Sequence, residues 1–119
     1  MPLTRHDYAH RWAKEFKMNS EEFVSLFKQE KENLKKDFLD IESGSQTAQL
    51  IGEIDLPKDK KERIIDSILT DTFYTILMGL DGSASIGDVQ EQYQIHDEKG
   101  NLITNGGDIE GHAFEQFQS

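Results

Sequence analysis

Apolar residues recur every three or four positions along three stretches of the chain, a spacing typical of amphipathic helices. The expected helices cover about residues 5–17, 20–42 and 58–79. In the first, Tyr8, Trp12 and Phe16 lie four apart, which places three aromatic rings on one helix face. Asn19 or Ser20 is the predicted N-cap of the second, since either side chain can accept a hydrogen bond from a backbone N–H of the first turn.

The third predicted helix is the most apolar part of the chain. Its isoleucine, leucine and phenylalanine side chains cover a broad arc and leave Ser67, Asp71 and Tyr74 as a narrow polar strip. We therefore expect this helix to be central and to contact other elements on several sides. Pro57 is expected in its first turn, and Asp55 is the predicted cap.

The pattern changes after residue 80, where glycine, serine and aspartate dominate as far as residue 88. From Val89 to His96 apolar and polar residues alternate with a period of two, which predicts a strand. Residues 97–101 supply a turn and residues 102–104 return, completing a β-hairpin. Asp108 can cap a short last helix. The predicted fold is α+β and helix-rich, with three main helices, a C-terminal β-hairpin and a short terminal helix in a single acidic domain, residues 1–119.

The composition of the chain limits the classes of partner and of chemistry that the sequence allows. The 119 residues include 13 Lys and Arg against 23 Asp and Glu, a net charge of −10, which argues against nucleic acid and anionic membranes as partners. The absence of cysteine excludes disulfides, metal thiolates and a cysteine nucleophile. The N-terminus is polar and charged without an apolar core, unlike a secretory signal, and no apolar run is long enough to span a membrane. We expect a cytoplasmic protein.

The negative charge is unevenly distributed along the chain. Residues 1–63 carry 12 basic and 13 acidic residues, a net charge of −1, whereas residues 64–119 carry Lys99 against 10 acidic residues, a net charge of −9. If folding gathers these carboxylates on one surface, that surface would attract a basic protein. The alternative interpretation is that the charge only keeps the protein soluble.

Two groups of residues invite a chemical interpretation. His6 and His10 lie four apart on the first predicted helix and can form half of a zinc or nickel site, with a third ligand from His96, His112 or a carboxylate. The plainer interpretation is two helix histidines, and we expect no cofactor. Ser83 would need a histidine base to act as a nucleophile, and no Gly-x-Ser-x-Gly motif surrounds it.

The stretch 73–87, together with Gln90, Gln92, Tyr93 and residues 97–101, resembles a pattern in short bacterial proteins that are similar to immunity-type partners of bacterial toxins. The resemblance covers about half of the chain. It implies a small, acidic, cofactor-free protein that binds another protein.

Our leading hypothesis is a non-enzymatic protein that binds a basic partner, with an immunity-like inhibitor as its most concrete form. Carboxylates would meet Lys or Arg, and a tyrosine would anchor the interface. The candidate partner-binding residues are Asp71, Tyr74, Asp81, Asp88, Glu91, Asp97 and Glu98. One alternative is a small ligand-binding or hydrolytic domain that uses the 81–88 loop. The other is a homo-oligomeric structural protein, paired through the first helix or an uncovered hairpin edge.

Overall fold

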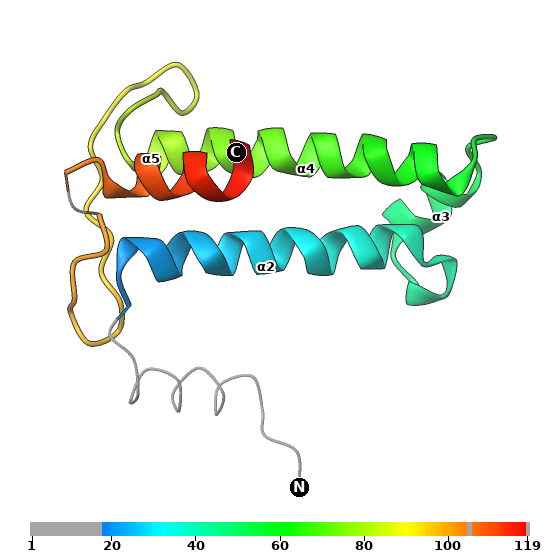
Figure 1. Ribbon diagram of the computed structural model, residues 1–119, viewed down its shortest axis with the longest axis horizontal. Helices are drawn as coiled ribbons and strands as arrows, with labels where there is room; N and C mark the ends of the chain where they lie inside the picture. The colour runs from blue at the N-terminus through cyan, green and yellow to red at the C-terminus, as the bar shows by residue number, and fades with distance from the viewer. Residues whose placement is uncertain (1–17, 105, 119) are drawn as a thin grey trace, which may run out of the picture.

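The computed structural model describes residues 18–104 and 106–118, so the helix expected over 5–17 lies outside the described residues. Helices α2 (Ser20–Leu39) and α4 (Lys58–Leu80) lie side by side and run antiparallel (Figure 1). The 3-10 helix η1 (Ile41–Ser43) and helix α3 (Gln46–Gly52) connect them at one end. Helix α5 (Asp108–Ala113) and the π-helix η2 (Phe114–Gln118) pack against both α2 and α4.

Local capping explains where α2 begins and ends. The Asn19 Oδ1 atom accepts a hydrogen bond from the Glu22 backbone N–H at 2.9 Å, as expected of an N-cap. The helix ends at Leu39, about three residues before the predicted end. Asp40 is extended, and its side chain accepts a hydrogen bond from the Glu42 N–H at 2.9 Å, which starts η1. A second cap thus interrupts the apolar pattern that predicted a longer helix.

Helix α4 confirms the third predicted helix, but not its cap. Pro57 is the N-cap residue and no side chain caps this end, so the assignment of Asp55 as the cap was wrong. The Pro57 carbonyl instead accepts hydrogen bonds from the Lys60 and Lys61 N–H groups, both at 3.1 Å. Proline fits this position because its fixed φ suits the entry to a helix.

The core lies where α2, α4 and α5 meet, at the end of the helix pair that carries the 81–107 segment. Its buried members are Val24, Leu77, Met78, Ile103, Ile109, Ala113 and Phe117. Beside it, the Phe27 ring packs edge-on between Phe23 and Phe73, with ring centroids 5.1 and 5.8 Å apart. The core therefore fixes the last helix and the preceding loop on the helix pair.

The described residues contain no β-strand or sheet, so the prediction of an α+β fold with a β-hairpin was wrong. The loop between α4 and α5, described over residues 81–104 and 106–107, has isolated bridges between Ile86 and Val89 and between His96 and Leu102. This also removes the hairpin edge as a surface for pairing between copies.

The turn at residues 97–101 does form, and the ladder stops next to it. Asp97 N–H donates to the Asn101 carbonyl at 3.0 Å, and Ile103 N–H donates to the Ile95 carbonyl at 2.7 Å. The Ile95 N–H, however, bonds to the Thr104 hydroxyl at 3.1 Å instead of to a backbone carbonyl. The Thr104 side chain thus accepts the Ile95 N–H that the next backbone hydrogen bond of a β-ladder would need.

Two further expectations about the helices were wrong. Gly107, at φ 92°, is the N-cap of α5, and Asp108 is already its first helical residue. Among the described residues, helix α4 packs on α2, α5 and η2 and is contacted by Ile86 at Gly79, but elsewhere its opposite side is open, with three exposed isoleucines: Ile64, Ile68 and Ile76. Within residues 18–104 and 106–118, no helix is both long and apolar enough to cross a membrane.

Candidate functional site

Carboxylates from three parts of the chain gather at the end of the helix pair that carries the core. The first turn of α2, the 81–107 loop and the start of α5 meet there (Figure 1). We call this region the acidic end, and its acidic residues are Glu21, Glu22, Asp81, Asp88, Glu91, Asp97, Glu98, Asp108 and Glu110. The segments 18–27 and 81–118, which build it, contain a single Lys or Arg, Lys99.

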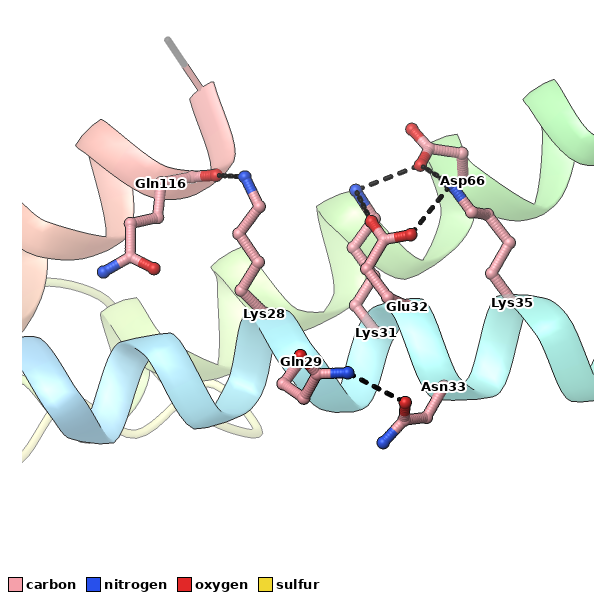
Figure 2. Close-up of polar contacts among 8 residues, drawn as sticks. All are labelled: Lys28, Gln29, Lys31, Glu32, Asn33, Lys35, Asp66 and Gln116. Atoms are coloured by element: carbon pink, nitrogen blue, oxygen red, sulfur yellow. Dashed lines mark hydrogen bonds and ion pairs between the residues drawn. The ribbon is translucent and has the colours of Figure 1, made fainter.

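Three lysines of α2 make their contacts away from most of these carboxylates (Figure 2). Lys31 and Lys35 hold Asp66 of α4, with N–O distances of 3.0 and 3.1 Å, and Lys35 also contacts Glu32 at 3.2 Å. Lys28 donates to the Gln116 carbonyl at 2.6 Å. In the C-terminal half, these lysines therefore neutralise a residue in the middle of α4 and not the acidic end.

The Asp66 contacts set the ionisation of the pair. Partial burial opposes the charged form of Asp66, but the hydrogen bonds from Lys31 and Lys35 outweigh it and hold the pKa of this carboxyl below its usual value. For Lys35, burial likewise opposes the charge, and the hydrogen bonds to Asp66 and Glu32 raise the pKa of the ammonium group. These ion pairs join α2 to α4 at a distance from the core.

A hollow of about 330 Å³ opens at the acidic end beside Asp81, the residue at which α4 ends. Its lining is mostly polar, with that carboxylate, Gln92, Gln94 and Thr104, and Tyr93 and Leu102 add apolar surface. Gly107 forms part of the wall, and a Cβ atom there would lie 3.9 Å from the Asp81 Oδ2 atom. Asp81 supplies a negative charge for the end of a Lys or Arg side chain, and Tyr93 and Leu102 offer apolar surface for its stem.

Ser83 lies between two carboxylates. Its hydroxyl is 2.9 Å from Asp81 Oδ2 and 3.0 Å from Glu110 Oε2. A hydroxyl has one proton to donate, so it satisfies one of these oxygens at a time. The partners of Ser83 are thus carboxylates and not the histidine that a serine nucleophile requires.

Asp97 builds the turn that follows the predicted strand. Its carboxylate accepts hydrogen bonds from Lys99 N–H, Asn101 N–H and the Asn101 side-chain amide at 2.8–2.9 Å. The side-chain bond from Asn101 is the main cause that lowers the pKa of Asp97, and a backbone N–H from Met18 adds to it. Asp97 therefore connects the loop to the residue that leads into α2.

Five of the seven predicted site residues, Asp81, Asp88, Glu91, Asp97 and Glu98, belong to the loop that begins where α4 ends. Asp88, Glu91 and Glu98 are exposed, and Asp88 adopts a left-handed φ of 69° in a tight turn. Asp71 and Tyr74 do not join them. Both lie on α4 before its last turn; Asp71 is exposed, and Tyr74 is half-buried against the core.

Sequence reasoning missed several residues of the site. Glu21 and Glu22 belong to the charge-balanced half of the sequence and reach the acidic end only because α2 begins there. Tyr93 lies within the segment predicted as a strand, and in the structure it lines the hollow. A signal for Glu110 was present, because it belongs to the acidic C-terminal half.

His6 and His10 lie outside the described residues. In the part of the chain that the structure describes, no three His, Asp or Glu side chains are arranged to hold a metal ion. Comparison with known proteins adds no relative, since no family model, curated protein or solved structure matches the chain. The similarity to immunity-type partners of toxins therefore stays a prediction.

Proposed function

We propose that this protein is a non-enzymatic binding domain whose acidic end docks on a basic patch of another protein. An immunity-like inhibitor of a basic toxin is the most concrete form of the proposal. The compartment that we propose for this binding is the cytoplasm, in keeping with a sequence that has no cysteine.

The observation that carries the proposal is the hollow at Asp81 within a region so poor in cations. A Lys or Arg side chain of the partner would extend its stem along Tyr93 and Leu102 and place its charge at Asp81. Glu110, which shares the Ser83 hydroxyl with Asp81, adds a second carboxylate nearby. Charged hydrogen bonds of this kind are stronger than neutral ones and favour a cationic side chain over a neutral one.

The surrounding carboxylates would mainly affect how fast the partner associates with this protein. A surface of one sign steers an oppositely charged partner and raises the association rate, and salt screens this effect. The partner should therefore bind faster at low ionic strength, with the contact at Asp81 limiting its dissociation.

Affinity capture with two matched variants tests the proposal. The full chain is immobilised and exposed to native lysate at low and at moderate salt, and retained proteins are identified by mass spectrometry. The test variant is Asp81→Asn with Glu91→Gln. The control is Asp59→Asn with Glu62→Gln, the same two chemical changes at exposed positions of α4.

We expect one basic protein that binds the wild type and the control, and whose affinity for the test variant falls by about tenfold or more. Purified, that protein should bind more slowly as salt is raised. Equal binding to both variants would contradict the proposal, as would the recovery of no basic protein at low salt.

A further inference from the structure

The side of α4 that faces away from α2 and α5 carries a row of aliphatic residues. Ile64, Ile68, Thr72 and Ile76 follow one another at intervals of four, so they form a ridge that winds slowly around the helix, by about 40° per step. The three isoleucines are 49%, 58% and 40% exposed. Single exposed aliphatic residues are ordinary, but a continuous row is typical of a surface that another molecule covers.

The loop after α4 extends this row. Ile86 packs on Gly79, where an added Cβ atom would collide with the Ile86 side chain. Gly79 lies on the same face, one turn beyond Ile76 and two turns beyond Thr72, and Ile86 is itself 42% exposed. In Figure 1 this yellow-green loop lies on the side of α4 away from α2. We call Ile64, Ile68, Thr72, Ile76 and Ile86 the α4 stripe.

Charge is divided between the two halves of the same helix. Residues 58–63 contain Lys58, Lys60, Lys61 and Arg63 against two acids, a net charge of +2. The second half of α4, residues 67–80, contains Asp71 and no Lys or Arg, a net charge of −1. Two copies of α4 that pack antiparallel would place the positive half of each against the negative half of the other.

The aliphatic row is also symmetric along the helix. Ile64 and Ile76 are equally far from residue 70, and so are Ile68 and Thr72. A two-fold axis at this level would pair Ile64 with Ile76 and Ile68 with Thr72, twice over. Such a self-complementary surface is what an isologous dimer interface requires.

From the exposed row, its symmetry and the divided charge, we propose that the occupant of the α4 stripe is a second copy of this chain, packed antiparallel across a two-fold axis near residue 70. One helix face is smaller than a standard interface of about 800 Å² per partner. The expected dimer is therefore weak, with a dissociation constant on the order of micromolar. The inference does not depend on the proposed partner binding, since Asp81 and Glu91 lie outside the stripe.

Sedimentation of the full chain from about 1 to 500 µM tests the association. We expect the mass to rise from 13.7 kDa towards twice that value. Ile68→Glu should raise the dissociation constant by about tenfold or more, because it places a charge at the centre of the interface. Leu50→Glu is the matched control, because Leu50 is an exposed aliphatic residue on α3 and lies away from the stripe. This change should leave the dissociation constant of the dimer unchanged.

A monomeric wild type at every concentration would overturn the proposal, and so would a dimer that Ile68→Glu leaves intact. If the wild type is monomeric and Ile68→Glu lowers its stability in urea, another part of the same chain covers the α4 stripe. That result would also overturn the proposal.

Single cysteines test the antiparallel packing, because the sequence has none of its own. With the axis near residue 70, the two copies of Thr72→Cys lie four residues apart along the helices, about 6 Å, and a short bis-maleimide should link them. The two copies of Lys60→Cys lie about 30 Å apart and should not be linked. Efficient linking through Lys60→Cys would indicate parallel helices and overturn the charge argument.

Discussion

At the scale of single residues, Asp66 shows how the helix pair is held together beyond its core. Lys31 is almost fully buried and Lys35 is largely so, and both direct their ammonium groups to the same carboxylate oxygen. A buried ammonium group that loses its counter-ion is costly, whereas an exposed ion pair contributes little. This cluster therefore stabilises the fold mainly because Asp66 provides the counter-ion that the buried Lys31 ammonium group needs.

Asp66→Asn should lower the free energy of unfolding by about 1–2 kcal/mol, because it leaves Lys31 without its nearest carboxylate. The cost is below that of a fully buried pair, since the Asp66 side chain is 41% exposed and solvent screens it. Urea denaturation at neutral pH measures it. Asp71→Asn, the same change at an exposed position of α4, should alter stability by less than about 0.5 kcal/mol.

The same pair predicts a dependence on acid. The pKa of Asp66 is lower in the folded chain than in the unfolded chain, so its stabilising contribution is complete above the unfolded value of about 3.9. It is lost as pH falls through the folded pKa. The difference in unfolding free energy between wild type and Asp66→Asn should therefore shrink below about pH 4. A difference that stays constant down to pH 2 would contradict the assignment.

Two glycine substitutions should act in opposite directions. Gly82 has a φ of 82°, and a Cβ atom there would come within 2.8 Å of the Gln92 side chain and 3.3 Å of its backbone, so Gly82→Ala should destabilise by about 1–3 kcal/mol. Gly111 lies in α5 with open space around it, so Gly111→Ala should stabilise by about 0.5–1 kcal/mol. Thermal unfolding of both variants checks the pair of signs.

At the scale of elements, the sequence was sufficient where structure is locally determined. The apolar period and the cap at Asn19 predicted α2, and the period alone predicted α4 within a residue at each end. The prediction of a β-hairpin was wrong, although residues 89–96 do alternate in polarity and the turn at residues 97–101 does form. The Ile95 N–H can donate either to a backbone carbonyl or to the Thr104 hydroxyl, and the choice depends on how this segment packs on the core. The periodicity of the sequence carries no information about that packing.

Helix α5 is too short to be stable alone, so we expect it to depend on its buried side chains. Ile109 is fully buried between α5 and the helix pair, and Ile109→Ala should cost about 2–4 kcal/mol. Phe114→Ala removes a larger side chain that is 56% exposed, and should cost less than about 1 kcal/mol. Equal losses in urea denaturation would show that α5 is held differently from this description.

At the scale of the whole molecule, the charge imbalance between the two halves of the sequence predicted an acidic surface. Five of the seven residues named for it belong to the loop after α4, and their role in binding stays a prediction. Asp71 and Tyr74 lie on α4, apart from this loop, and the half-burial of Tyr74 follows from packing that the sequence pattern does not contain. The hollow at Asp81 was beyond sequence reasoning, since its walls come from the end of α4 and from residues 92–107.

The central claim is that the acidic end concentrates negative charge for a cationic partner. The most direct measurement is a titration of the ¹⁵N-labelled chain with pentalysine at low salt, followed by amide chemical shifts. The account predicts that shifts concentrate at residues 81–98 and 106–111, are reduced in Asp81→Asn with Glu91→Gln, and disappear when salt is added. Shifts spread evenly over α2, α3 and α4, or shifts that the double variant leaves unchanged, would contradict it.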